Sequence, residues 1–224
     1  MQVICFDFDD VIVDGSLVFK LIKTRPEFSE LKLGFEFMFE NQNPKEFYKV
    51  IKKIVKVGKG LGFDEIKRIM FGFKVINGAK RLFNKLKENY KIVIVSANDT
   101  GMIKEFLKKH KLLDCIDRIY GSELGVKDGK LTGAISGDVI RTEKTAIVKK
   151  IEKAYRIKRK DITYVGDGLT DLPIIKLVGN GILFCPSMIT QAEVFRDKIL
   201  SKMEKDGELF LIEKKDLSEI LRFV

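Results

Sequence analysis

A cluster of carboxylates at residues 7–10 is the first group of side chains whose spacing could support catalysis or metal binding. Asp7, Asp9 and Asp10 directly follow the apolar run at residues 3–6. Carboxylates crowded together repel one another, so they need raised pKa values or a bound cation. Mg²⁺ prefers oxygen ligands, and it accepts one or two carboxylates together with water and phosphate oxygens. This stretch therefore indicates a magnesium site at the end of a buried strand.

Two further runs have the same pattern: residues 92–95 are apolar, and residues 162–165 are apolar except for Thr163. Both end in polar residues. A lysine, Lys144, stands between these two runs in the sequence. Hydroxyl and ammonium groups are good donors to phosphate oxygens, so the chemistry indicated is that of a phosphate ester. The residues that follow the two runs and bear on a site are Ser96, Ala97, Asn98, Asp167 and Asp171.

The first carboxylates suit two different roles in phosphoryl transfer. Asp7 can act as a nucleophile, as aspartates do in reactions that pass through an aspartyl-phosphate. Asp9, two residues on, can protonate the leaving oxygen and later deprotonate the attacking water. The residues by themselves thus predict a phosphoryl-transfer site that uses Mg²⁺.

The elements that must position these residues follow an alternating pattern. Short apolar runs typical of buried strands alternate with helical patterns, which predicts an α/β fold with a doubly wound, Rossmann-like parallel sheet. Ligands bind such sheets beyond the carboxyl ends of the strands, where the polar residues stand. Asp128 and Gly129 predict a tight hairpin turn, and Thr142 is a candidate cap for the helix that follows.

Residues 15–77 have a different composition from the rest of the chain. They contain nine of the 17 phenylalanines, and 13 Lys or Arg against 7 Asp or Glu, a net charge of +6. Their apolar residues recur at helical spacing, and Asn43 is a candidate helix cap. We therefore expect a core domain of residues 1–14 and 78–224, with a helical cap domain of residues 15–77 inserted after the first strand.

Composition limits the class of protein and its partners. A chain of 224 residues suffices for a core domain with an insert. No apolar run approaches the roughly 18 residues of a membrane span, and no signal peptide is evident, so a cytoplasmic protein without a membrane partner is expected. The formal charge of +10 suggests acidic partners, namely a small phosphorylated metabolite or, as an alternative, nucleic acid.

Four ordered motifs resemble the haloacid-dehalogenase-like superfamily, most closely its phosphoserine phosphatase-like branch. They are DxDxxxxD at residues 7–14, the strand-ending Ser96, Lys144, and GDGxxD at residues 166–171. The resemblance covers the expected core well and the insert poorly. It implies Asp7 as nucleophile and magnesium ligand, Asp9 as general acid/base with its backbone carbonyl on the metal, Ser96 and Lys144 as phosphate-binding groups, Asp167 as a metal ligand, and Asp171 as a support of the metal site.

The chain departs from this branch in two places near the substrate. Where the branch usually has Ser-Gly-Gly, this chain has Ser96-Ala97-Asn98, so the Ala97 amide must approach the phosphate beside an extra side chain. The phosphoserine enzymes also place a glutamate shortly after the first motif, and here none occurs before Glu27. These differences weaken the case for phosphoserine as substrate without affecting the phosphatase chemistry. The segment of residues 186–206 is also longer than the corresponding segment of the branch.

The sequence therefore predicts a Mg²⁺-dependent phosphatase that hydrolyses a small phosphomonoester through a phospho-Asp7 intermediate. One alternative is a phosphotransferase, or a phosphatase for a nucleotide or a nucleic-acid end. A second alternative is a non-catalytic basic module that binds nucleic acid on the same fold. No oligomeric state is predicted.

Overall fold

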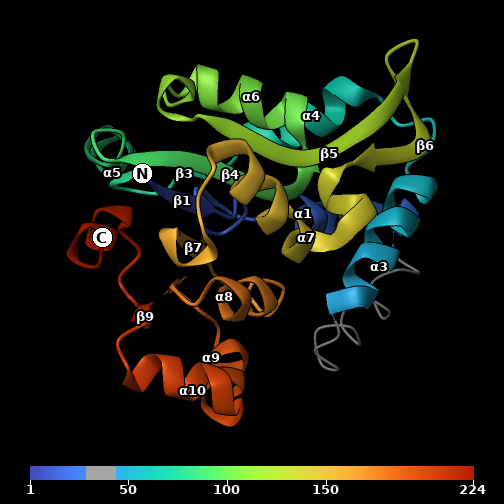
Figure 1. Ribbon diagram of the computed structural model, residues 1–224. Coiled ribbons are helices and arrows are strands. Elements are labelled where there is room, and N and C mark those ends of the chain that lie inside the picture. The colour runs from blue at the N-terminus through green and yellow to red at the C-terminus, as the bar shows by residue number, and fades with distance from the viewer. Residues whose placement is uncertain (29–43) are drawn as a thin grey trace.

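A seven-stranded sheet forms the centre of the fold in the computed structural model, which describes residues 1–28 and 44–224 (Figure 1). The order is β6-β5-β4-β1-β7-β8-β9, and all neighbours are parallel except β5 and β6. The predicted doubly wound α/β fold is confirmed. The strands are β1 (Gln2–Phe6), β4 (Tyr90–Asp99), β5 (Arg118–Lys127), β6 (Lys130–Gly137), β7 (Ile162–Gly166), β8 (Gly181–Phe184) and β9 (Leu209–Ile212).

Strand β1 is apolar throughout because both faces of the sheet are covered. Its side chains alternate between two hydrophobic clusters: Ile4 and Phe6 lie in one, and Val3 and Cys5 in the other. Helices α5 (Ala79–Leu86) and α6 (Thr100–Lys109) contribute to the first cluster, and α7 (Asp138–Tyr155) and α8 (Leu172–Val178) to the second.

Three regions differ from, or extend, what the sequence predicted. Helix α7 begins at Asp138, so Thr142 lies inside the helix and is not its cap. Strand β9 was not predicted, because four apolar residues between charged segments give little periodic signal. The long stretch 186–206 forms helices α9 (Met188–Arg196) and α10 (Lys198–Lys205), which bury Val194 and Leu200 in the second cluster.

The two ends of the insert, near residues 14 and 75, lie side by side. Strand β2 (Val13–Asp14) pairs antiparallel with β3 (Lys74–Val75), which brings the two ends of the insert together. Its described helices are α1 (Leu17–Thr24), the short 3₁₀ helix η1 (Pro26–Phe28), α3 (Pro44–Val57) and α4 (Phe63–Phe71). The predicted cap at Asn43 lies outside the described residues.

The insert packs against the β5–β6 hairpin. Gly60 N donates to Leu131 O, and Leu131 N donates to Leu61 O, both at 2.8 Å. The hairpin turns at Asp128 and Gly129, which both have positive φ, as the sequence predicted. The insert and the sheet therefore share one hydrophobic cluster rather than meeting through a loose linker. None of the described helices is long and apolar enough to cross a membrane.

Candidate active site

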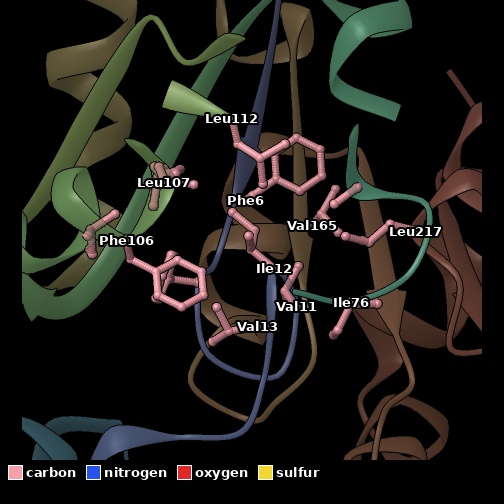
Figure 2. Close-up of a cluster of buried hydrophobic side chains, with 14 of the residues drawn as sticks. Phe6, Val11, Ile12, Val13, Ile76, Phe106, Leu107, Leu112, Val165 and Leu217 are labelled. Atoms are coloured by element: carbon pink, nitrogen blue, oxygen red, sulfur yellow. The ribbon is translucent and has the colours of Figure 1, made fainter. Parts of the chain in front are cut away.

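The loop after β1 is anchored by its own buried apolar side chains. Val11, Ile12 and Val13 are fully buried and lie among Phe6 and other members of the first cluster (Figure 2). The loop also folds on itself, because Ile12 N donates to Phe8 O at 2.9 Å. This anchoring leaves the intervening carboxylates little freedom to move.

Asp7 is fixed at the point where β1 ends. Its backbone N–H donates to Val165 O on β7 at 2.9 Å, and its own Oδ1 accepts from Phe8 N at 2.7 Å. Strands β4 and β7 flank β1 on its two sides and run parallel to it, so all three carboxyl ends meet at one edge. The strand pattern in the sequence predicted that these three strand ends would meet.

A cavity of about 100 Å³ lies at this edge of the sheet. Asp171 does not line this cavity; it is completely buried and contacts Lys144, which does. The structure thus places all eight predicted site residues together, seven in the cavity wall and one behind it. The seven are Asp7, Asp9, Ser96, Ala97, Asn98, Lys144 and Asp167.

Lys144 joins two of the carboxylates. Its Nζ lies 2.6 Å from Asp7 Oδ2 and 2.7 Å from Asp171 Oδ1, and the side chain is buried. Burial by itself would lower the pKa of Lys144, but the carboxylates of Asp171 and Asp7 outweigh that effect and raise the pKa well above its ordinary value. Lys144 is therefore a permanent positive charge beside Asp7.

Asp171 is saturated with hydrogen bonds. Oδ1 accepts from Lys144 Nζ and from the Tyr164 hydroxyl at 2.9 Å, and Oδ2 accepts from the backbone amides of Asp167 and Gly168 at 3.2 Å. A carboxylate offers about four lone-pair positions, and these four donors use them. Asp171 is thereby suited to support a site rather than to ligate a metal directly.

The carboxylates carry more negative charge than Lys144 alone balances. Asp7, Asp167 and Asp171 each offer an oxygen within 4.8 Å of the others. Burial raises the pKa of Asp7 to about 6, against the opposing effect of Lys144. Burial, then Asp171 and Asp7, raise the pKa of Asp167 well above its usual value. A hard divalent cation would supply the missing positive charge, so this donor set fits Mg²⁺ through Asp7 and Asp167.

Asp9 is held in a different environment from Asp7. Its Oδ1 accepts from Asn98 Nδ2 at 2.7 Å. Burial first, then the neighbouring Asp7, raise the pKa of Asp9 to about 7, although hydrogen bonds from Asn98 and Ser16 oppose the shift. A carboxyl group that titrates near neutrality can both donate and accept a proton at working pH.

Asn98 and Ser96 are linked through the backbone. Asn98 N donates to Ser96 Oγ at 3.2 Å, so the Ser96 hydroxyl keeps its own hydrogen for another acceptor. The sequence placed the Asn98 side chain beside the phosphate, and the structure shows its amide on Asp9 instead. The unusual Asn98 therefore orients the candidate acid/base.

Two tyrosines near the site were not identified from the sequence. Tyr164 donates to Asp171, as described above. Tyr48, on α3 of the insert, accepts a hydrogen bond from Lys144 N at 3.1 Å. Its pKa is raised to about 12, mainly by burial, so the hydroxyl stays protonated. The polar tip of Tyr164 inside an apolar strand is a signal that a buried partner exists, whereas Tyr48 has no comparable signal.

Replacing Tyr48 with phenylalanine is expected to destabilise the fold by about 0.5–1.5 kcal/mol, because the hydrogen bond from the Lys144 N–H to the Tyr48 hydroxyl is lost. The free energy of unfolding from urea titrations measures this. Tyr155→Phe makes the same change near the end of α7, away from the site, and should cost less than about 0.5 kcal/mol. Equal effects of the two substitutions would contradict a specific role for Tyr48.

Comparisons with known proteins agree with this geometry. The profile of haloacid dehalogenase-like hydrolases matches residues 4–176. A phosphoserine phosphatase of Methanocaldococcus jannaschii is 28% identical over 225 residues, which cover 100% of this chain and 97% of the relative. One of Archaeoglobus fulgidus is 31% identical over 208 residues, or 92% of this chain, but this chain spans only 57% of that relative.

A solved structure, described as a phospho-aspartyl intermediate analogue of phosphoserine phosphatase, superposes with a TM-score of 0.78. It is 28% identical in sequence, and the match covers 100% of this chain and 98% of the other. A substrate-bound phosphoserine phosphatase complex gives the same TM-score at 26% identity. The predicted family and branch are confirmed: this chain belongs to the haloacid dehalogenase-like hydrolases and is an enzyme of their phosphoserine phosphatase-like branch.

Proposed function

We propose that the chain is a Mg²⁺-dependent phosphatase that hydrolyses a small phosphomonoester through a phosphate ester of Asp7. The observation that carries the proposal is the arrangement around Asp7 and Asp9. One carboxylate is paired with a buried lysine, and its neighbour has a pKa of about 7. A nucleophile and a separate acid/base are the two groups that this reaction needs.

The residues would divide the reaction as follows. Asp7 attacks phosphorus, and Asp9 in its protonated form gives a proton to the leaving alkoxide. Lys144 and Ser96 hold the phosphoryl oxygens. Asp9, now a carboxylate, removes a proton from the water that attacks phosphorus, which releases inorganic phosphate and restores Asp7. Mg²⁺, held by Asp7, Asp167 and the backbone carbonyl of Asp9, would neutralise charge on the phosphoryl oxygens.

We also propose that residues 15–77 act as a cap over a core of residues 1–14 and 78–224. Ser16, Val18, Phe19 and Phe47 of the insert line the cavity that contains Asp7, which supports this division. A cap in this position excludes water and selects the leaving group, and it must open to release product.

The proposed class of substrate is supported by relatives that are named phosphoserine phosphatase. These relatives support a phosphatase that acts on a small phosphorylated metabolite. They favour it over a phosphotransferase and over a phosphatase for a nucleotide or a nucleic-acid end. The presence of both a candidate nucleophile, Asp7, and a candidate acid/base, Asp9, supports catalysis over a non-catalytic binding module. A cytoplasmic location stays a prediction.

Release of inorganic phosphate from a generic aryl phosphate at neutral pH tests the proposal. Release should require Mg²⁺ and should stop when a chelator removes the metal. A panel of phosphorylated metabolites, a nucleotide and a 5′-phosphorylated oligonucleotide then separates the proposed substrate class from the alternatives. No release from any member of the panel, with Mg²⁺ shown to bind, would favour the non-catalytic module.

Replacing Asp9 with asparagine is expected to lower kcat/KM by about 10²–10⁴-fold for an alkyl phosphate, since the alkoxide then leaves without a proton. The loss should be smaller for p-nitrophenyl phosphate, whose leaving group is stable as an anion. Steady-state kinetics with both substrates measures the difference. Equal losses for the two substrates would argue against Asp9 as the acid.

Mg²⁺ should raise the melting temperature more at pH 8 than at pH 5. The pKa of Asp7 and Asp9 is raised in the folded state, so without metal the folded state loses stability as the pH rises from about 4 towards 7. A cation binds the deprotonated carboxylates and offsets this loss where they are charged. Melting curves with and without Mg²⁺ at both pH values check this, and an equal shift at both would contradict it.

A further inference from the structure

The insert contributes an apolar wall to the active-site cavity. Its described lining residues are Val18, Phe19 and Phe47, with Ser16 at the base beside Asp9. Among the described residues of this wall, the insert provides no charged side chain. The charged members all come from the core and are Asp7, Asp9, Asp10, Lys144 and Asp167.

A second cavity, called here the apolar chamber, adjoins the first. It has a volume of about 50 Å³, and Val18, Ala97 and Asn98 line both this chamber and the active-site cavity. A single water needs roughly 10–15 Å³ on this measure, so the chamber has room for several carbon atoms. Its other walls are mostly aliphatic or aromatic, and include Leu21, Phe28, Ile54, Leu131 and Ile135.

The polar groups in the chamber wall do not provide a site for a charged ligand. Asp99 is engaged by its own fold: Oδ1 accepts from Met102 N and Oδ2 from Leu124 N, each at 2.9 Å. Ser122 is buried, and its Oγ has no hydrogen-bond partner among the described residues. A single neutral hydroxyl cannot balance a charged group brought into the chamber.

We propose that the apolar chamber takes the leaving group, so that the preferred substrate is a phosphomonoester of an apolar alcohol rather than of an amino acid. This rests on the proposed phosphatase function. A serine leaving group would bring an ammonium and a carboxylate against Val18, Phe19 and Phe47 of the insert, and the described insert residues of this wall offer them no charged partner. An alkyl chain would instead move from water into an apolar cavity, which is favourable.

The test compares kcat/KM for n-propyl, n-butyl and n-pentyl phosphate with that for O-phospho-L-serine. Propyl phosphate and phosphoserine share a three-carbon skeleton, so their ratio isolates the two charged groups. Propyl phosphate should be preferred at least tenfold, and each added methylene should raise kcat/KM by roughly fourfold until the chamber is filled.

Preference for phosphoserine, or no dependence on chain length, would overturn the inference and leave the phosphatase function standing. Failure to hydrolyse any of these esters or an aryl phosphate would overturn both. The two failures are therefore distinguishable in one set of assays.

Filling the chamber provides a matched test on one hairpin. Ile135 lines the chamber, whereas Val126 is exposed and lines neither cavity. Ile135→Phe should reduce the pentyl-to-propyl ratio of kcat/KM by about tenfold, and Val126→Phe should leave the ratio unchanged. Leu124→Phe fills the same chamber from the neighbouring strand and replaces Ile135→Phe if that variant does not fold. A ratio that both filling variants leave unchanged would overturn the inference.

Discussion

Asp7→Asn is expected to reduce Mg²⁺-dependent phosphate release by at least about 10³-fold. The amide is a poor nucleophile, and it also removes a negative oxygen from the proposed metal ligands. The protein should still fold, because Lys144 keeps its 2.7 Å contact with Asp171 when Asp7 loses its charge. Phosphate release with an aryl phosphate measures the loss, and circular dichroism confirms folding.

Asp14→Asn is the matched control for this substitution. Asp14 ends the same sequence motif, but it is exposed and pairs with Lys215 instead of lining the cavity. It should retain activity within about twofold. If Asp7→Asn stayed active while folded, Asp7 would not be the nucleophile. Trapping of labelled phosphate on the wild type, but not on the variant, would identify the covalent intermediate directly.

Lys144→Met has the second largest expected effect, and it acts on both stability and activity. The substitution leaves Asp7 and Asp171 as buried carboxylates without their shared cation, a change that typically costs about 3–5 kcal/mol. Activity should fall by about 10²–10³-fold, because a donor to the phosphoryl oxygens is lost. Chemical denaturation and kcat/KM for the aryl phosphate measure the two effects.

Two further variants separate charge from general disruption of α7. Lys150→Met removes an exposed lysine of the same helix, whose partner is Asp138, and should cost less than about 1 kcal/mol. Adding Asp171→Asn to Lys144→Met removes one of the stranded charges and should recover part of the stability but not the activity. Normal stability and activity of Lys144→Met would exclude this lysine from the site.

The fold class follows from local patterns that a sequence displays directly. Residues 3–6 and 92–95 are continuous apolar runs, and residues 162–165 are apolar except for Thr163, because each becomes a strand inside the covered sheet. Polar residues after each run identify the carboxyl edge of a parallel sheet, so the members of the site could be named without their contacts. The turn at Asp128 and Gly129 was predictable for the same reason, since its conformation is set by two adjacent residues.

Tertiary structure decided how those members act on one another. Asn98 reaches Asp9 across 89 positions of sequence, and Tyr48 reaches Lys144 across 96. No local pattern encodes such contacts, because they depend on which elements pack together. The same limit explains why β9 was missed, since its pairing with β8 defines it more than its own composition.

The sequence by itself determined which groups are present and in which order: the carboxylate proposed as nucleophile, a second carboxylate two residues on, a lysine, and two aspartates that follow the strand at residues 162–165. Only the tertiary structure decided their chemical state. The pKa of about 7 at Asp9, the saturation of Asp171 and the apolar chamber beside Ala97 all arise from burial and from neighbours distant in the chain. Burial removes the water that would otherwise screen and solvate these groups, and depth of burial is a property of the folded molecule.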